Sequence, residues 1–464
     1  MKALSLFAGG GIGDLALRSA GIDMVVANEL LEERADLVEF NFPDSTVISG
    51  DIWKSKESIL SACKGHSIEL VLATPPCQGM SKNGRGKLLS GVRDGRKDPV
   101  DPRNLLVVPT IDIFLKLDAH TLIMENVPEM KDTLIPIQEG TGFIKILDYI
   151  RFRLGQEFVS QVKVIEFADY GVPQFRQRLI SIFSRHPSVV SAHKNGFSLF
   201  PSPTHSKPGT QTGLPPWRTV RDAIEHLPPL DASSTKRAES KDVNYHRVPT
   251  LDQRKYFWVS STPPESGAFD NQCVKCGFEG NPVHGAKKNF HGINQSNKTT
   301  PIYCMECNSL LPRPTTVEAN GNVRLMSGFT SAYKRMKWDE PASTLTRNLS
   351  YACSDKKLHP EQHRVLSLYE AMVIHTIDDY SYEWKRASGK KVSDKLIREV
   401  IGESIPPLGL ETVFRQALTI LREGTVQADC NEFEGNLEAL APCKQEQFTA
   451  LFARSLLGKG NSPL

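Results

Sequence analysis

The stretch ALSLFAGGGIGDLALRSAG, residues 3–21, decides the fold. Its first five residues predict a strand, because apolar side chains dominate them, and the glycines that follow predict a tight turn. The segment DLALRSAG then predicts a helix, with Asp14 stabilising its amino end and Gly21 closing it. A strand that runs through a glycine turn into a helix is the first unit of an α/β sheet.

The same unit recurs along the first 180 residues, where short apolar runs alternate with helical stretches. Further strands are predicted in DMVVANE, STVISGD, IELVLATPPC, HTLIMEN and VKVIEF, which begin at residues 23, 45, 68, 120 and 162. This alternation predicts a doubly wound parallel sheet. Ligands of such sheets bind beyond the carboxyl ends of the strands. The residues predicted at that rim are Gly9, Gly11, Gly13, Glu29, Asp51, Cys77, Glu125 and Asn126.

The rim carries the pattern of a nucleoside site. Glu29 follows Gly9 by 20 residues, the spacing at which a carboxylate on the second strand meets ribose hydroxyls. Asp51 suits the same nucleoside from the third strand. The glycine turn lacks the usual G-x-x-G tail that cradles a pyrophosphate, so a dinucleotide and S-adenosylmethionine both remain candidates at this point. A tight turn beside a solvated glutamate is the plain structural alternative.

Cys77 stands in ATPPCQGMSKNGRG, residues 73–86, between a proline corner and a glycine-rich cationic segment. An isolated cysteine is most often buried and inert. Here, however, residues 79–103 carry seven Lys and Arg against three Asp, and positive charge near a thiol favours the nucleophilic thiolate. The glycines predict a loop that closes over an anionic ligand. We therefore predict a reactive thiol at this position.

Length and composition limit the class of protein that the chain can be. With 464 residues, 39% of them hydrophobic and 23% charged, the chain fits two globular domains plus appendages. Its apolar runs are too short to cross a bilayer and its first residues do not resemble a signal peptide, which predicts a soluble intracellular protein. Nine cysteines, an odd number, favour reduced thiols over a disulfide framework. The net charge is only +3, yet residues 185–340 hold 20 Lys and Arg against 13 Asp and Glu, a surplus that fits a solvated surface or one that binds a polyanion.

Six motifs follow one another along the chain: FAGGGIG at 7–13, PPCQGMS at 75–81, ENV at 125–127, YGVPQFRQR at 170–178, DEPASTLTR at 339–347 and IGESIPP at 401–407. In this order they resemble the DNA (cytosine-5)-methyltransferase family, over most of residues 1–185 and 338–415. The resemblance implies an α/β fold: a doubly wound sheet that binds S-adenosylmethionine, and a smaller, mostly irregular or β target recognition domain. It also implies methyl transfer to carbon 5 of a cytosine that is rotated out of duplex DNA.

The resemblance assigns chemical roles to the rim. Cys77 would be the thiolate that adds to carbon 6 of cytosine. Glu125 would be the acid that hydrogen-bonds or protonates ring N3 and the exocyclic amine, and Asn126 would fix its loop. Gln78 would take part in closing the loop over the vacated base position.

Two arginines complete the expected catalytic set. Arg176 and Arg178 alternate on QFRQRLISIF, residues 174–183, and so share one face of an extended segment with Gln174. By resemblance, Arg178 contacts the target base and the region of the catalytic carboxylate, and Arg176 supports the loop that carries Cys77. No side chain stands out as the base for the carbon-5 proton, for which a water or hydroxide is expected.

The cofactor residues are matched in the same way. They are Phe7, Gly9, Gly11, Glu29, Leu30, Asp51, Ile52, Pro76, Leu106, Gly402, Ser404 and Ile405. Two positions depart from the family pattern. The family usually has asparagine where this chain has Glu403, and often an aromatic residue where it has Leu30. Both departures predict weaker cofactor contacts, and neither removes a group that the reaction requires.

The second half contains a predicted metal site. We divide the chain into a first catalytic part (1–185), a target recognition domain (186–355), a hinge (356–390), a return segment (391–425) and an extension without an assigned role (426–464). The recognition domain holds two C-x-x-C pairs separated by 27 residues, which predicts a zinc ribbon at 273–307 with a structural zinc ion. Unmetallated thiols, or His284 or His291 in place of one cysteine, are the alternatives. The predicted ligands are Cys273, Cys276, Cys304 and Cys307.

The expected protein is thus a bacterial restriction-modification methyltransferase. It would act on double-stranded DNA in the cytoplasm as a monomer, alongside a cognate restriction endonuclease. A transfer-RNA cytosine-5 methyltransferase shares many of these motifs, but its recognition region is small. A catalytically silent DNA-binding homologue would not need Cys77 together with Glu125. A nicotinamide-dependent oxidoreductase explains neither PPCQ nor ENV.

Overall fold

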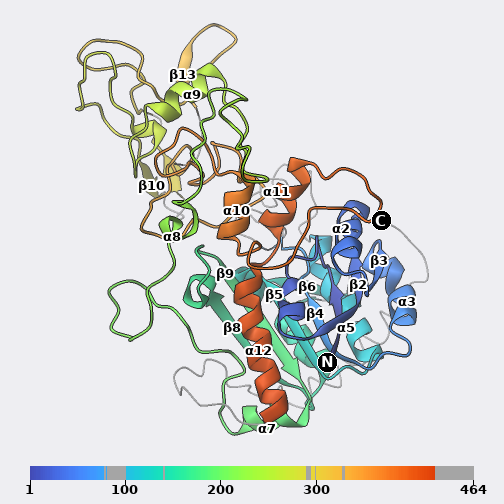
Figure 1. Cartoon of the computed structure of the whole chain (residues 1–464). Helices are drawn as coiled ribbons and strands as arrows, with labels where there is room; N and C mark the ends of the chain where they lie inside the picture. Colours follow the sequence, from blue (N-terminus) through green and yellow to red (C-terminus); the bar gives the residue numbers. More distant parts are fainter. Residues whose placement is uncertain are drawn as a thin grey trace.

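The computed structural model describes residues 1–77, 80, 101–138, 142–288, 294–297, 299–326 and 330–423. Gln78, His291 and the segment 426–464, which carry predictions, lie outside the described residues. Figure 1 shows an α/β body and, above it, a second body built mostly of loops, short helices and hairpins. Among the described residues, no helix combines the length and the apolar character that a membrane crossing requires.

A seven-stranded sheet in the order β3-β2-β1-β4-β5-β9-β8 forms the centre of the α/β body. Its parallel part, as predicted, consists of β1 (Lys2–Leu6), β2 (Asp23–Glu29), β3 (Thr46–Ser49), β4 (Ile68–Ala73) and β5 (Thr121–Asn126). The sheet departs from the predicted all-parallel arrangement at β8 (Val159–Glu166) and β9 (Gln177–Ser184), because β9 is antiparallel to both its neighbours. The connection between β8 and β9 is too short for a parallel crossover.

Helices cover the two faces of the sheet and bury two hydrophobic cores. The first core contains residues of α1 (Leu15–Ser19), α2 (Glu32–Asn41), α7 (Pro187–Lys194), α8 (Val220–Ile224), α10 (Leu368–Ile374), α11 (Asp394–Glu403) and α12 (Pro407–Glu423). The second contains residues of α3 (Ile52–Ala62), α5 (Val107–Lys116) and α6 (Ile146–Leu154). Because α7 and α8 belong to the first core, the early part of the predicted 186–355 domain packs on the catalytic half.

The second body has its own core, with members from Leu230 to Val365. Its regular elements are α9 (Gln253–Ser260) and two short antiparallel hairpins, formed by β10 (Ala286–Lys288) with β11 (Asn294–Ser296) and by β12 (Thr315–Val317) with β13 (Val323–Leu325). The mostly irregular and β character therefore agrees with the prediction. The remaining short elements of the chain are η1 (Pro102–Leu106), η2 (Pro128–Asp132), β6 (Leu134–Gln138), β7 (Gly142–Lys145), η3 (Phe167–Tyr170) and η4 (Ala268–Asp270).

A buried polar cluster joins the two bodies at the start of α10. Ser367 and Glu370 form a capping box, which fixes the first turn of the helix. The Glu370 carboxylate also receives two hydrogen bonds, of 2.6 and 2.7 Å, from the Arg364 guanidinium. His246, from the second body, bonds the Ser367 hydroxyl at 2.9 Å. The junction between the two bodies at the start of α10 is therefore held by charged and polar groups that are shielded from water.

Candidate active site and cofactor pocket

The glycine turn after β1 is locked to the end of β2 by Glu29. The backbone N–H of Gly9 donates to one carboxylate oxygen of Glu29 at 2.8 Å, and the N–H of Leu31 donates to the other at 3.0 Å. Phe7 and Gly9 have φ of +63° and +59°, so the chain reverses sharply at this point. Burial raises the pKa of Glu29, although these N–H groups oppose the shift. The predicted ribose carboxylate thus lies directly against the turn.

Residues from the far end of the chain cover this turn. The Tyr382 hydroxyl donates to the Gly10 carbonyl at 2.7 Å, and a Cβ on Gly10 would lie 2.6 Å from the Val400 side chain. Gly10 is therefore required by close approach. Sequence reasoning missed both partners, because neither one lies in a motif. Val400 lies in α11, within the return segment. Gly402, Ser404 and the buried Ile405 follow it in the same segment.

The nucleoside side of the rim carries exposed apolar side chains. Leu30 is 61% exposed and Trp53 is 48% exposed, each beside a predicted cofactor residue. Asp51 is the N-cap residue of α3, where its carboxylate accepts the N–H of Trp53 at 3.0 Å. Ile52 is buried in the second core, against which Phe7, Leu106 and Cys77 also pack. Trp53 was not predicted, and it offers an aromatic face near the position where Leu30 lacks one.

Cys77 follows β4 and is held by β5. Asn126, the last residue of β5, donates from its side-chain amide to the carbonyl of Pro75 at 3.0 Å and accepts the N–H of Val127 at 2.8 Å. Pro76 completes the corner between Pro75 and the thiol. Asn126 therefore fixes the approach to Cys77 as well as its own loop.

An ion pair lies beside the thiol. Arg178 Nε and Glu125 Oε1 are 2.7 Å apart, and both side chains are almost fully buried. Burial raises the pKa of Glu125, while the charges of Arg178 and Arg176 oppose the shift. The same two arginines act on Cys77, yet burial dominates there as well and raises the pKa of the thiol. The thiol is therefore the resting form, because loss of water outweighs the nearby positive charge.

Arg176 bonds two segments that are distant in sequence, while the loop that it is expected to support lies mostly outside the described residues. Its guanidinium donates to the carbonyl of Leu345 at 2.9 Å and to that of Ser404 at 2.5 Å, and its hydrogen bonds do not reach the residues 74–77. It is fully buried and precedes β9, so that Arg178 alone of the pair lies within the strand. Arg176 thus ties the cofactor-side return segment to the catalytic strand, and it faces Cys77 only through its charge.

Asp14 does not cap α1 as predicted. No backbone N–H bonds its carboxylate, which is almost fully buried and faces the Ser5 hydroxyl. Burial raises its pKa to about 7, with the charge of Glu29 acting in the same direction. A carboxylate in this state, close to the glycine turn, is suited to a cationic ligand group.

The unexpected Glu403 has partners of its own. Its carboxylate lies 2.8 Å from the Arg34 guanidinium on α2 and 3.8 Å from that of Arg347. A Cβ on the adjacent Gly402 would lie 2.0 Å from the backbone nitrogen of Arg347, so the two segments touch through their main chains. Glu403, which replaces the family's asparagine, therefore links α11 to α2 and to the segment that carries Arg347.

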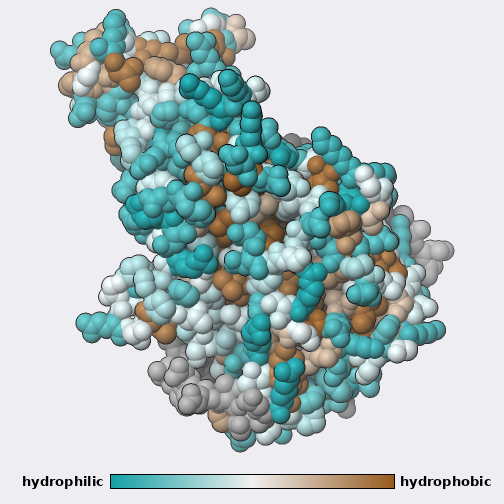
Figure 2. Space-filling view, viewed as in Figure 1, coloured by the Kyte–Doolittle hydropathy of each residue, from teal (hydrophilic) through white to brown (hydrophobic). Residues whose placement is uncertain are grey.

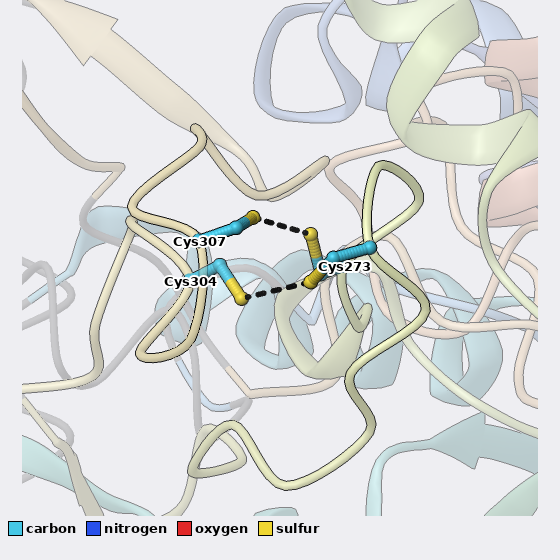
Figure 3. Close-up of side chains that lie close together, drawn as sticks. Cys273, Cys304 and Cys307 are labelled. Carbon is cyan, nitrogen blue, oxygen red and sulfur yellow. Dashed lines mark hydrogen bonds between the residues drawn. The ribbon is translucent and has the colours of Figure 1, made fainter.

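The four predicted metal ligands lie together in the second body. The sulfur atoms of Cys273, Cys276, Cys304 and Cys307 are all within 4.8 Å of one another. Figure 3 shows the thiols of the two C-x-x-C turns facing each other, with Sγ distances of 3.6 Å between Cys273 and Cys307 and 3.7 Å between Cys276 and Cys304. In a tetrahedral zinc site with Zn–S bonds of ~2.3 Å, neighbouring sulfur atoms are ~3.8 Å apart.

The surroundings of this cysteine cluster also fit a metal site. Hydrogen bonds among the thiols link their protonation, so that the pKa of Cys307 is lowered while that of Cys276 is raised. His284 instead bonds the Thr300 hydroxyl through Nδ1 and lies outside the group of four sulfur atoms. Val274 and Met305, the second residues of the two C-x-x-C turns, are exposed. Figure 2 shows apolar areas among hydrophilic ones on the second body.

Comparison with known proteins identifies the family. The sequence pattern of the family described as C-5 cytosine-specific DNA methylase matches residues 1–419. The chain is 27% identical over 430 residues to the type II methyltransferase M1.HgaI of Avibacterium volantium, over 90% of this chain and 98% of that protein. It is 33% identical over 250 residues to the type II methyltransferase M.AquIA of Picosynechococcus sp., over 50% of this chain and 91% of that protein.

The fold has a match among solved structures. A protein described as a DNA modification methyltransferase encoded within an E. coli prophage superposes with a TM-score of 0.53 at 16% identity, over 91% of this chain and all of that one. At this identity the likeness supports the fold alone. The family pattern, in contrast, spans the glycine turn, the cysteine corner, the arginine strand and the return segment. The chain therefore belongs to the C-5 cytosine-specific DNA methylase family.

Proposed function

We propose that the protein methylates carbon 5 of a cytosine within a short, specific sequence of duplex DNA, as the modification enzyme of a type II restriction-modification system. Family membership gives the reaction class, and the similarity to M1.HgaI and M.AquIA supports the type II setting. The observation that carries the mechanism is the position of Cys77 beside the buried Glu125–Arg178 ion pair at the carboxyl edge of β4 and β5.

Cys77 begins the reaction. Its sulfur gives up its proton to water and forms a bond to carbon 6 of the cytosine ring, while the displaced electron pair moves toward ring N3, which makes carbon 5 nucleophilic. Because burial raises the pKa of Cys77, the resting protein holds a thiol. The positive charges of Arg178 and Arg176 stabilise the thiolate as it forms.

Glu125 offsets the charge that sulfur attack pushes into the ring. Burial raises the pKa of Glu125, which favours the proton-carrying form that can donate to ring N3. Arg178 keeps the carboxyl group in place through the 2.7 Å contact. Carbon 5 then takes the methyl group and afterwards loses its proton to water or hydroxide. The carbon 6–sulfur bond breaks, and Cys77 leaves as a thiolate.

S-adenosylmethionine supplies the methyl group, and the pocket around the glycine turn fits that molecule. Glu29 has the placement for ribose hydroxyls, and Asp51 and Ile52 stand where the adenine would lie. The buried carboxylate of Asp14, which lies close to Glu29, supports a ligand with positive charge. Gly402, Ser404 and Ile405 close the pocket from α11. Pro76 and Leu106 form the wall toward Cys77.

DNA must present the cytosine outside the base stack, since carbon 6 is inaccessible in a duplex. Rotating the nucleotide outward costs a few kcal/mol. We assign the cationic segment after Cys77, including Gln78, to the vacated position, and the second body to the surrounding sequence. The Lys and Arg surplus of residues 185–340 suits phosphate contacts, which position the protein, while base-edge contacts select the sequence.

A structural zinc ion at Cys273, Cys276, Cys304 and Cys307 is part of the proposal. The sulfur spacing supports it, because four sulfur atoms within 4.8 Å of one another match a tetrahedral zinc site. Elemental analysis should find about one zinc per chain, as a four-cysteine site requires. Cys307→Ser should lose the metal and the order of the second body while the α/β body stays folded. Full zinc occupancy in that variant, or a metal-free native protein, would argue against the site.

The enzyme is tested by bisulfite sequencing of DNA from cells that express the protein. Methylated cytosines should fall in one short sequence, and Cys77→Ser should abolish them while DNA binding persists. Oligonucleotides with 5-fluorocytosine should trap a covalent adduct at Cys77, because carbon 5 then has no proton to lose. Methylation of transfer RNA in place of duplex DNA would support the alternative substrate class. Unchanged activity of Cys77→Ser would refute the mechanism.

We also propose that the enzyme acts as a monomer and has a cognate endonuclease. One chain supplies all the catalytic and cofactor residues described above, so no partner copy is required. Light scattering at working concentration tests the first point. Protection of methylated plasmid from nucleases of matching sequence specificity tests the second.

A further inference from the structure

His375 lies at the carboxyl end of α10 and is fully buried, yet it belongs to no sequence motif assigned above. Both of its ring nitrogens have partners. Nδ1 lies 3.2 Å from the side-chain nitrogen of Gln174, which precedes the catalytic arginines. Nε2 lies 3.0 Å from the hydroxyl of Ser404 in the return segment. One imidazole thus connects the arginine segment with the cofactor side.

The direction of every hydrogen bond in this connection can be assigned. The N–H of Leu345 donates to Gln174 Oε1 at 3.0 Å, so the amide nitrogen of Gln174 must face His375 and donate to Nδ1. The imidazole is therefore protonated at Nε2, and it donates to Ser404 Oγ. The Ser404 hydroxyl proton remains free for the carbonyl of Ile401, 3.1 Å away. The relay runs in one direction, from Leu345 to Ile401.

The relay requires a neutral imidazole. A proton on Nδ1 would point at the Gln174 amide, which is itself a donor. Burial and the charges of Arg176 and Arg178 lower the pKa of His375 well below its usual range. Arg176 runs parallel to the relay, because its guanidinium donates to the carbonyls of Leu345 and Ser404. Ser404 is thus held through its hydroxyl by His375 and through its carbonyl by Arg176.

We propose that His375 is a positioning residue for methyl transfer: through its Nε2–H tautomer it fixes Ser404, and with it the segment that closes the cofactor pocket, relative to the catalytic arginines. This inference rests on the proposed function, which places the cofactor against Gly402, Ser404 and Ile405. His375 has no contact with the base or with Cys77. It acts by setting the distance between Ser404, on the cofactor side, and the segment of Gln174 that leads to the catalytic arginines.

The test compares variants that keep or remove the relay. His375→Gln retains one acceptor and one donor, whereas His375→Leu leaves the amide nitrogen of Gln174 without an acceptor and the hydroxyl oxygen of Ser404 without a donor. Affinity for S-adenosylhomocysteine, measured by calorimetry, needs no turnover. We expect His375→Leu to lose at least about tenfold in affinity, as buried polar groups without partners imply. In methylation assays the KM for S-adenosylmethionine should rise by a similar factor, and His375→Gln should restore most of both.

His246 provides a matched control at the other end of the same helix. It is equally buried and bonds Ser367 at 2.9 Å and the carbonyl of Pro228 at 2.7 Å, two partners that lie outside the return segment. His246→Leu should lower the melting temperature but leave the affinity for S-adenosylhomocysteine near the wild-type value. A purely structural role for His375 predicts that both leucine variants behave alike.

Three results would overturn the inference: wild-type affinity in His375→Leu, equal loss of affinity in His246→Leu, or no recovery in His375→Gln. If His375→Leu does not fold, His375→Asn carries the comparison, because its shorter amide reaches only one partner and should bind less tightly than His375→Gln. Failure of the proposed function is recognised separately. In that case either the wild-type protein itself would bind no S-adenosylhomocysteine, or Cys77→Ser would leave methylation intact.

Discussion

Replacing Glu370 by Gln should uncouple the two bodies of the protein. Burial opposes ionisation of Glu370, but the charge and hydrogen bonds of Arg364 lower its pKa from 4.5 to about 2. At ~1.4 kcal/mol per pKa unit, this shift corresponds to about 3 kcal/mol of stability. The variant also leaves the buried Arg364 charge uncompensated, a change that typically costs ~3–5 kcal/mol. We expect a loss of roughly 3 kcal/mol at pH 7.

The pH dependence distinguishes this ion pair from a general packing defect. A carboxylate with a depressed pKa contributes its full stability above pH 4.5, and the contribution disappears as the pH falls toward 2. The difference between wild type and Glu370→Gln should therefore shrink through that window. His359, whose pKa burial lowers to about 3, adds a separate loss of stability below pH 6.5, because only the unfolded chain takes up its proton. Glu370 lies 4.0 Å from His359 and raises its pKa, so in Glu370→Gln this second loss extends to a lower pH.

Urea unfolding followed by circular dichroism at pH 7, 4.5 and 3 measures the effect. Glu57→Gln is the matched control, since the Glu57–Lys116 pair has a 3.0 Å contact but its carboxylate is 79% exposed. The control should lose less than about 1 kcal/mol. The reasoning fails if Glu370→Gln loses no more than the control, or if its deficit stays constant from pH 7 to pH 3.

Three further changes have defined outcomes. Asp14→Asn should raise the free energy of unfolding of the cofactor-free protein at pH 8 by about 1–4 kcal/mol, because burial raises the pKa of Asp14 from 3.8 to about 7. Near pH 4 the free energy of unfolding should be unchanged. Chemical denaturation at both pH values checks this. Glu403→Gln removes the 2.8 Å contact with Arg34, so affinity for S-adenosylhomocysteine should fall at low salt and lose its salt dependence in titrations; an unaltered salt response would contradict this. Gly402→Ala places a carbon 2.0 Å from the backbone nitrogen of Arg347. It should destabilise the protein by ~1–3 kcal/mol and weaken cofactor binding. Gly285→Ala, whose added carbon meets no neighbour, should do neither, and equal melting temperatures of the two variants would refute the steric argument.

The sequence by itself determined the parts that depend on local order. A strand, a glycine turn and a helix are short-range patterns, and parallel strands place the residues that follow them on one rim. Glu29, Asp51, Cys77 and Glu125 were therefore predicted at one edge of the sheet without knowledge of their contacts. The two C-x-x-C turns were recognised in the same way, since each is a local motif.

Only the tertiary structure decided how groups that are distant in sequence act on one another. Burial, which depends on the whole fold, raises the pKa of the Cys77 thiol against the nearby positive charge, and the Asp14 side chain makes no cap hydrogen bond to α1. Arg176 reaches Leu345 and Ser404 across more than a hundred residues, and His375 bridges two such segments. The sequence pattern does not predict these contacts, because it gives only distances along the chain. Hydrogen bonds and desolvation depend instead on distances in space.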